Sequence, residues 1–400
     1  MYDAIVVGAR CAGAPTAMLL ARKGYRVLLA DRATFPSDIP HGHFIHRGGP
    51  ARLQRWGVLD ALLATGCPPM RSLTSDYGDY AMVADDMILD GVSFGYGPRR
   101  AVLDEVLVRA AVDAGAELRE GYVVEEFLRE GEPVTGVRGR TVATGMRSEE
   151  RAAITIGADG RNSRLARAVS APIYAATPPL SCWYFSYWSG IPADGLELYV
   201  VRDRAIFAFP THDSLFAVMV EWPAQDMPRV RMDIEGEFRA VVARVPDLAQ
   251  RLRQGRREER FQGATDLPNF LRRPYGPGWA LVGDAGCHKD PFLALGICDA
   301  FRDADFLAVA LDDAFSGLRT FDAALADYHR KRDEATYADY MQNLHFARFQ
   351  PPPPDFLRLR AAVRGNPEAT RQLLMALEGR IPRDEFFAPE RLASLMAART

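Results

Sequence analysis

The first 32 residues of this 400-residue chain constrain its fold most strongly, because they combine two apolar strands with a glycine turn and a helix. Residues 4–7 form a short apolar run, typical of a strand buried on both faces of a parallel sheet. Residues 12–22 have helical composition, and Gly24 stands where a glycine ends a helix. Residues 26–30 predict a second buried strand. The order strand, helix, strand is the βαβ unit of a Rossmann-like α/β fold.

The turn between the first strand and the helix reads GARCAG, from Gly8 to Gly13. It keeps the first and last glycines of the dinucleotide-binding pattern G-x-G-x-x-G but has Arg10 in the middle. Gly8 allows the tight turn, and Gly13 lets the helix pack closely on the strand. The N–H groups of the helix N-terminus, beginning at Ala12, would face a pyrophosphate with the positive end of the helix dipole. Arg10 blocks the nearest backbone approach, although its guanidinium could contact a phosphate instead.

The second strand ends at an acidic residue, Asp31, which is followed by Arg32. A carboxylate at this position would accept hydrogen bonds from the hydroxyl groups of a ribose. The incomplete glycine pattern is a weak signal alone, but with the two strands, the helix and the terminal acid it predicts a nucleotide site. The alternative is a Rossmann-like turn that binds nothing.

A second glycine-containing turn lies about 270 residues later, in the stretch LVGDAGCHKDPFLALG. Gly283 and Asp284 follow a buried strand, where an acid can hold the hydroxyl groups of a sugar or polyol. Pro291 restricts the chain. Gly296 and Ile297 open the next helix, whose N–H groups and dipole would stabilise negative charge on a ring system. The alternative is an ordinary turn followed by a capped helix.

The remaining sequence predicts further units. Residues 123–156 alternate in short segments separated by glycines, which indicates a β-meander. Residues 1–170 and 276–340 are expected to form the nucleotide-binding domain. Aromatic and β-branched strands in residues 171–275 predict an antiparallel-sheet domain that binds the substrate. Residues 341–400 are expected to form a helical C-terminal segment.

Composition excludes several classes of protein. The chain is 48% hydrophobic and 25% charged, which is ordinary for a soluble globular protein, and its net charge of -3 gives no electrostatic case for nucleic acid or an anionic membrane. No apolar run of about 18 residues is present, so no membrane span is expected. The five cysteines are scattered and odd in number, which predicts neither disulfides nor a zinc site and favours a reduced, cytoplasmic setting.

Three motifs occur in order: GARCAG at 8–13, GADGRNSRLAR at 157–167, and GDAGCHKDPFLALG at 283–296. With them, the chain resembles the FAD-dependent monooxygenases of the p-hydroxybenzoate hydroxylase type, the group A flavoprotein monooxygenases. Flavin halogenases and geranylgeranyl reductases are wider relatives of that family. The resemblance covers residues 1–340 and implies that FAD is the cofactor, gripped at its two ends by the two glycine turns.

The resemblance also implies roles for individual residues. The ADP half of FAD would be held by the first turn and the acid after the second strand, the ribityl chain by Asp284, and the isoalloxazine by the end of the second turn. Asp159 would help to hold FAD and the approaching NAD(P)H. The family's FAD-contacting arginine corresponds to Arg100. The expected cofactor residues are Gly8, Ala12, Gly13, Asp31, Arg32, Arg100, Asp159, Gly283, Asp284, Pro291, Gly296 and Ile297. The chain departs from the family pattern at Arg10 and at Lys289–Asp290.

The implied reaction is reduction by NAD(P)H, reaction of the flavin with O₂ at C4a, and transfer of oxygen from that hydroperoxide to a substrate. An aromatic-rich middle domain favours an apolar or aromatic small molecule. The choice between NADH and NADPH stays open, as does a separate flavin reductase that would supply reduced flavin. In the loop after the second strand, His43 is a candidate for acid–base work or substrate binding, with a structural role equally open. No metal site is predicted.

Other functions remain as alternatives. The main one is an FAD-dependent reductase of carbon–carbon double bonds, similar to geranylgeranyl reductases. A halogenase would need a lysine between flavin and substrate, and no lysine occurs between Lys23 and Lys289, so halogenation is disfavoured. A flavin-binding interaction protein without turnover is the non-enzymatic alternative.

Overall fold

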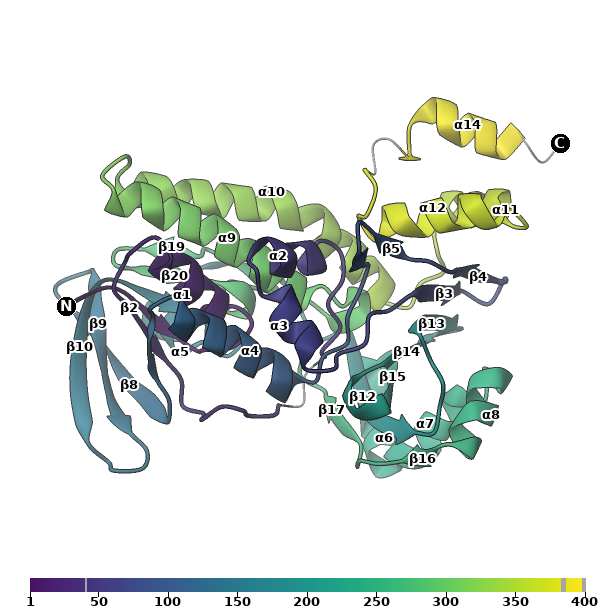
Figure 1. Cartoon of the computed structure of the whole chain (residues 1–400), viewed down its shortest axis with the longest axis horizontal. Helices are drawn as coiled ribbons and strands as arrows, with labels where there is room; N and C mark the ends of the chain where they lie inside the picture. Colours follow the sequence, from purple (N-terminus) through teal and green to yellow (C-terminus); the bar gives the residue numbers. More distant parts are fainter. Residues whose placement is uncertain (40–41, 383–385, 398–400) are drawn as a thin grey trace.

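A computed structural model describes residues 1–39, 42–382 and 386–397. Figure 1 shows two large sheets with long helices over the first and a group of C-terminal helices beside the second. The predicted α/β fold, with a Rossmann-like unit, a β-meander and an antiparallel sheet, is confirmed.

The first sheet has a parallel centre whose strands end together. Its order is β19-β20-β10-β1-β2-β7, and β8 and β9 pair with each other and with the first half of β10. Val7, at the end of β1, is in register with Ala30 of β2 and with Gly157 of β10, and Gly157 is in register with Leu281 of β20. The carboxyl ends of four strands therefore meet at one edge, where open α/β sheets bind ligands. The bounds are β1 (Tyr2–Val7), β2 (Val27–Ala30), β7 (Glu117–Arg119), β8 (Tyr122–Arg129), β9 (Val134–Thr141), β10 (Arg147–Gly157), β19 (Tyr275–Gly276) and β20 (Trp279–Leu281).

Helices cover one face of this sheet and the meander covers the other. On the helical side, α1, α4 and α9 pack their apolar residues against β1 and β2, and α10 packs on α9. On the other side, Tyr122, Val124 and Val137 of β8 and β9 close over Ile5 and Leu28. The helices are α1 (Gly13–Ala21), α2 (Gly49–Arg55), α3 (Leu59–Ala64), α4 (Arg100–Asp113), α5 (Arg164–Ala168), α9 (Gly296–Phe315) and α10 (Phe321–Ala347).

The second sheet has the order β16-β12-β15-β14-β13-β3-β4, with β17 also pairing with β12. One face packs against α6, α7 and α8 through Trp188, Trp222 and Phe238. The other face turns toward the first sheet. The elements are β12 (Ser181–Ser189), β13 (Gly195–Val201), β14 (Arg204–Pro210), β15 (Phe216–Pro223), β16 (Arg256–Arg257), β17 (Gln262–Ala264), α6 (Met227–Met232), α7 (Ile234–Val242) and α8 (Pro246–Gln254).

Two strands of this second sheet come from the N-terminal part of the chain. β3 (Ser72–Asp76) pairs in parallel with β13 and in antiparallel with β4 (Ala81–Ala84). These strands lie inside the segment 1–170 that was expected to belong wholly to the nucleotide-binding domain. The difference arises because Ser72 and Asp194 hydrogen-bond across a sequence separation that local patterns do not reveal.

Two small β units and the C-terminal helices complete the fold. β11 (Ile173–Thr177), β18 (Asn269–Arg272) and β21 (Cys287–His288) form a three-stranded sheet, and β5 (Ile88–Leu89) pairs with β6 (Val92–Ser93). Within the residues that the structure describes, four short 3₁₀ helices follow the strand ends: η1 (His212–Ser214), η2 (Ala224–Asp226), η3 (Gly283–Ala285) and η4 (Pro291–Leu293).

The C-terminal segment is helical, as predicted, but its expected start at residue 341 falls inside one continuous helix, α10. α11 (Pro354–Val363), α12 (Pro367–Leu377) and α14 (Pro389–Ala397) follow. α12 packs on β4, and its residues Leu373 and Leu374 join the apolar cluster around Trp183 and Phe185 (Figure 1). The C-terminal helices thus contribute to the core on the cavity-facing side of the second sheet.

Candidate functional site

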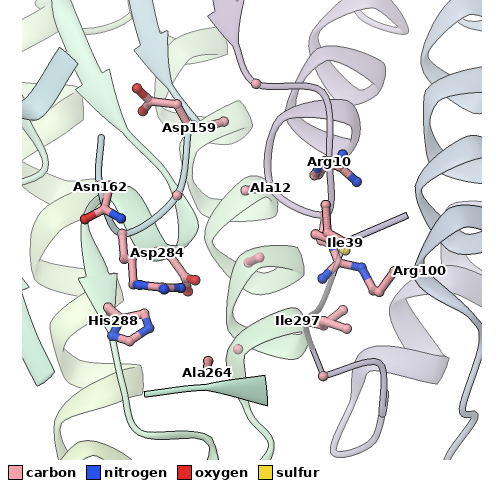
Figure 2. A pocket seen from close by; sticks show the side chains of 18 of the residues that line it. Arg10, Ala12, Ile39, Arg100, Asp159, Asn162, Ala264, Asp284, His288 and Ile297 are labelled. Atoms are coloured by element: carbon pink, nitrogen blue, oxygen red, sulfur yellow. The ribbon is translucent and has the colours of Figure 1, made fainter. Parts of the chain in front are cut away.

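A cavity of about 790 Å³ lies where the carboxyl ends of the parallel strands meet the second sheet. Figure 2 shows Arg10 and Arg100 on one side of this cavity and Asp159 and Asn162 on the other, with Ala12 between them. The cavity brings together most of the residues expected to hold a cofactor: Gly8, Ala12, Asp31, Arg32, Arg100, Asp159, Asp284, Pro291, Gly296 and Ile297, and also His43. Gly13 and Gly283 lie behind this lining.

The glycine positions of the first turn leave no room for a side chain. Gly8 has φ +103°, and a Cβ there would lie 2.4 Å from the carbonyl oxygen of Ala158. A Cβ on Gly13 would lie 1.7 Å from the carbonyl oxygen of Gly8. Gly283, with φ +61°, packs against Ala12, whose Cβ would lie 2.8 Å away from an added Cβ. The two glycine turns therefore touch, and only glycine fits at these three positions.

Asp31 braces the first turn and reaches the cavity. Its carboxylate accepts hydrogen bonds from the backbone N–H of Ala9 at 2.7 Å and of Ala33 at 2.8 Å. The side chain is largely buried at the end of β2, and each oxygen has a second lone pair available. This arrangement suits a ribose that donates its hydroxyl protons.

Arg10 does not supply the free phosphate ligand that its position in the turn suggested. Its guanidinium pairs with Asp104 at 2.5 Å and donates to the carbonyl oxygen of Ser37 at 3.1 Å. Arg100 binds the same fully buried Asp104 from the other side, at 3.0 Å. Asp104 thus fixes both arginines at the cavity wall, and because one carboxylate balances only one guanidinium, the three side chains together keep a net positive charge there.

Asp159 and Asp284 line the same cavity from the ends of β10 and β20. Asp159 accepts a hydrogen bond from the backbone N–H of Arg164 at 2.7 Å, while its Oδ1 is buried with no hydrogen-bond partner. Burial raises the pKa of Asp159 above its ordinary value. An unpartnered buried oxygen at a cavity wall is a position for a ligand hydroxyl.

The end of the second turn presents a helix N-terminus to the cavity. Gly296 is the first residue of the 20-residue helix α9, and Pro291 begins the preceding 3₁₀ helix. Both residues line the cavity. The N-terminal N–H groups of α9 suit a ring edge that carries negative charge.

His43 lies at the meeting of the cofactor side and the second sheet. It is buried, with its Nδ1 3.3 Å from the carbonyl oxygen of Gly97 and its Nε2 3.0 Å from the hydroxyl of Tyr187. Burial and the nearby charge of Arg99 lower its pKa from 6.5 to about 3. His43 is therefore a neutral hydrogen-bonding group at neutral pH.

The wall opposite the glycine turns is one aromatic face of the second sheet. Alternate residues of β12, β14 and β15 point into the cavity, while Tyr184 and Trp188 point to the other face and pack beneath α7. The cavity-facing residues are Trp183, Phe185, Phe207, Phe209, Ala217 and Met219. The aromatic run of β12 therefore divides into a cavity half and a core half, as the period of two in a strand requires.

Sequence reasoning missed several residues of this wall and its surroundings. The alternation in β15 would have indicated Ala217 and Met219, since they share a face with each other and with Glu221. Lys289 and Asp290 line the cavity but were noted only as departures from a family pattern. Within the described residues, no group of three or more His, Cys, Asp or Glu side chains is arranged to hold a metal ion.

The residues fit FAD. The two glycine turns pack against each other, Asp31 and the helix N-termini line one continuous cavity, and Asp159 has an unpartnered oxygen there. No described helix is both long and apolar enough to cross a membrane.

Comparisons with known proteins agree with this fit. The tryptophan 2-halogenase of Chondromyces crocatus is 24% identical over 337 residues, which are 82% of this chain and 64% of the halogenase. The digeranylgeranylglycerophospholipid reductase of Methanosarcina mazei is 26% identical over 79% of this chain and 76% of that protein. Squalene epoxidase of Schizosaccharomyces pombe is 24% identical over 76% of this chain and 68% of that protein.

Solved structures show the same fold. The myxobacterial chondrochloren halogenase CndH superposes with a TM-score of 0.79 at 20% identity, covering 99% of this chain and 96% of that one. PqsL of P. aeruginosa, solved with 2-aminobenzoylacetate, gives a TM-score of 0.73 at 20% identity, covering 93% and 99%. The profile of the FAD binding domain family matches residues 1–341, so the chain belongs to this family and is an FAD-dependent oxidoreductase.

Proposed function

We propose that the protein is a monooxygenase that uses NAD(P)H and O₂ to hydroxylate or epoxidise an apolar or aromatic small molecule. The observation that carries the proposal is that the aromatic face of the second sheet and the cofactor-binding turns line one cavity. When bound, FAD supplies the electron transfer from the nicotinamide to dioxygen.

The side chains have distinct roles in this proposal. Asp31 binds the ribose of FAD, and Asp284 the ribityl chain. Phe185, Phe207 and Met219 hold the substrate and exclude water, which oxygen-transfer chemistry requires. We assign the reaction to the cytoplasm, since all five cysteines are buried and none forms a disulfide. A separate flavin reductase is an alternative source of electrons.

The test is turnover with isotopically labelled dioxygen. Purified protein loaded with FAD is mixed with NADH or NADPH and a panel of apolar and aromatic compounds. The expected result is substrate-dependent consumption of nicotinamide and O₂, with labelled oxygen in the product. Consumption of nicotinamide without label in any product contradicts monooxygenation.

Reduction of carbon–carbon double bonds is the second candidate, favoured by the 26% identity to the digeranylgeranylglycerophospholipid reductase. The same reaction run without O₂ separates the two functions, because only a reductase then gives a saturated product.

A halogenase is less favoured despite the similar folds. Of the three lysines, Lys289 alone lines the cavity, and its buried ammonium pairs with Asp299 of α9. An ammonium held in that pair is not directed toward a substrate on the aromatic wall. Halide-dependent formation of a halogenated product would contradict this assignment.

A further inference from the structure

The cavity-facing side of the second sheet ends in an acid. Glu221 follows Ala217 and Met219 on the same face of β15, with Trp183 and Ala205 beside it in register on the flanking strands. It is fully buried, with 0% exposure. An ionisable side chain at the end of an otherwise apolar face needs a partner.

That partner is a second acid, Asp290. The carboxyl groups of Glu221 and Asp290 are in hydrogen-bonding contact, and Asp290 is only 2% exposed. Asp290 accepts hydrogen bonds from the hydroxyl of Ser181 at 2.7 Å and from the backbone N–H of Phe292 at 3.2 Å. Among the described residues, Glu221 has no backbone donor of its own, and the hydroxyl of Ser181, which lies beside both acids, donates to Asp290.

No cation neutralises the two acids in the part of the chain that the structure describes. Lys289 pairs with Asp299, and Arg204 of β14 pairs with Asp226. His288 of β21 is held at the carbonyl oxygen of Pro268, and positive charge on its ring lowers the pKa of Asp290. The thiol of Cys182 is the remaining titratable group that faces Glu221. The pair therefore depends on its own protons.

Two ionised carboxylates in contact in a dry site repel each other, so one must retain a proton. Asp290 already accepts two hydrogen bonds and suits the anion, whereas Glu221 lacks such a backbone donor and suits the acid. In this arrangement Glu221 donates its own O–H to Asp290. Burial, followed by the charge of Asp290, raises the pKa of Glu221 well above its ordinary value.

Asp290 connects the pair to the cavity, since it lines the wall next to Pro291. We propose that Glu221 and Asp290 share one proton and supply it to a basic atom formed in the cavity during turnover. The inference rests on the proposed FAD-dependent function. In the step, the O–H bond of Glu221 breaks as its proton moves to Asp290, and Asp290 passes that same proton to the basic atom, which leaves both carboxyl groups ionised until the pair is reprotonated. Water later restores the lost proton, and no electrons are exchanged with the pair.

The shared proton is tested first without turnover, by infrared spectroscopy of the protein in H₂O and D₂O at neutral pH. The wild-type protein should show a carbonyl band of a buried protonated carboxylic acid that shifts in D₂O, and Glu221→Gln should lack it. Glu197→Gln is the matched control, because Glu197 lies on the opposite face of the same sheet in an ion pair with Arg251. A wild-type protein without the band, or a band that survives in Glu221→Gln, overturns the pair.

The supply of the proton is tested by the midpoint potential of bound FAD, measured against pH with dithionite as the reductant. Wild type and Glu197→Gln should show an additional bend in this curve at the pH where the pair ionises, and Glu221→Gln should show none. Identical curves for wild type and Glu221→Gln overturn the supply of the proton, even where the infrared band is present.

A second variant guards against misfolding. Asp290→Asn keeps the shape of the side chain but removes the anion that accepts the proton of Glu221, so the wild-type band should shift in position. An unshifted band overturns the pair. A protein that binds no FAD overturns the proposed function and the delivery step together, whereas the infrared band reports on the pair alone.

Discussion

The Nε2 atom of His43 lies 3.0 Å from the hydroxyl oxygen of Tyr187, and its Nδ1 atom lies 3.3 Å from the carbonyl oxygen of Gly97. A carbonyl oxygen only accepts, so Nδ1 carries the proton and Nε2 accepts from Tyr187. The guanidinium of Arg99 also lies over the ring of Tyr187, 4.1 Å from its centroid. His43 is therefore locked in one neutral tautomer, which makes it a positioning group for the loop at the cavity rather than a titrating base.

This lock predicts a specific loss of stability in acid. The pKa of His43 is lowered to about 3, below its ordinary 6.5, so between these values the unfolded chain binds the additional proton. The stability that His43 contributes is present above pH 6.5 and is lost as pH falls, by up to about 1.4 kcal/mol per pH unit. His43→Gln should flatten the fall in the free energy of unfolding from pH 6.5 toward pH 4, measured by urea titration. His329→Gln, on α10, is the control, and equal slopes for both variants contradict the lock.

For Glu221 we expect a pH dependence of stability with the opposite sign. Its raised pKa means that the folded protein holds a proton that the unfolded chain releases above about pH 4.5. Stability therefore falls as pH rises through this window, by up to about 1.4 kcal/mol per unit. Glu221→Gln removes this dependence. The free energy of unfolding of the variant, relative to that of wild type, should therefore increase as the pH rises from 5 to 8. A constant difference between the two proteins counts against a neutral Glu221.

The first glycine turn predicts a sharp contrast between two alanine variants. In Gly13→Ala the new Cβ meets the carbonyl oxygen of Gly8 at 1.7 Å, so the turn must move and the affinity for FAD should fall at least about tenfold, or about 1.4 kcal/mol. Gly24→Ala is the control, because Gly24 has φ +89° but no atom within 4 Å of its added Cβ. It should lose about 1 kcal/mol of stability from backbone strain and keep its FAD. Flavin fluorescence titration measures the affinity.

Asp31 predicts a loss of cofactor affinity without a loss of fold. Asp31→Asn keeps one acceptor oxygen for Ala9 but removes the charge, and hydrogen bonds to charged groups contribute about 1.5–3 kcal/mol. The dissociation constant for FAD should rise by roughly 10- to 100-fold. Asp3→Asn is the matched control, since Asp3 accepts the N–H of Arg26 at the other end of the same sheet. Unchanged affinity in Asp31→Asn would show that the acid does not hold the ribose.

Arg360 predicts that the C-terminal helices stabilise the second sheet. It is fully buried on α11 and donates to Asp79 at 2.7 Å and to the carbonyl oxygen of Tyr80 at 2.7 Å. Arg360→Met leaves these acceptors without their donor and should cost about 2–4 kcal/mol of unfolding free energy, measured in urea. Arg358→Met, at an exposed site of the same helix, should change stability by less than about 0.5 kcal/mol.

The sequence was most informative where structure is local. The turn at Gly8–Gly13, the acid at Asp31 and the helix at Gly296 each follow from a few adjacent residues, so the α/β fold and FAD could be predicted. The partner of Arg10 could not, because Asp104 lies 94 residues away on α4. The pairing of Glu221 with Asp290 could not be predicted either, because the two residues are far apart in the sequence. In addition, a sequence does not distinguish a buried acid from a solvent-exposed one.

The hairpin of β3 and β4 escaped prediction for a different reason. Its strand SLTSD turns Leu73 and Ser75 inward, so the alternation carries only one apolar residue. Farther along the N-terminal part, Gly57 with φ +68° separates α2 from α3.

Neither large sheet is encoded by one uninterrupted stretch of chain, because β3 pairs with β13 in the second sheet and β20 pairs with β10 in the first. A fragment of residues 171–275 alone would expose β13 as a bare edge, ready to recruit another molecule in place of its missing neighbour. During synthesis, more than a hundred residues follow β3 before its partner β13 is made. The two sheets are therefore expected to assemble cooperatively, and fragments that contain only one of them should be difficult to obtain.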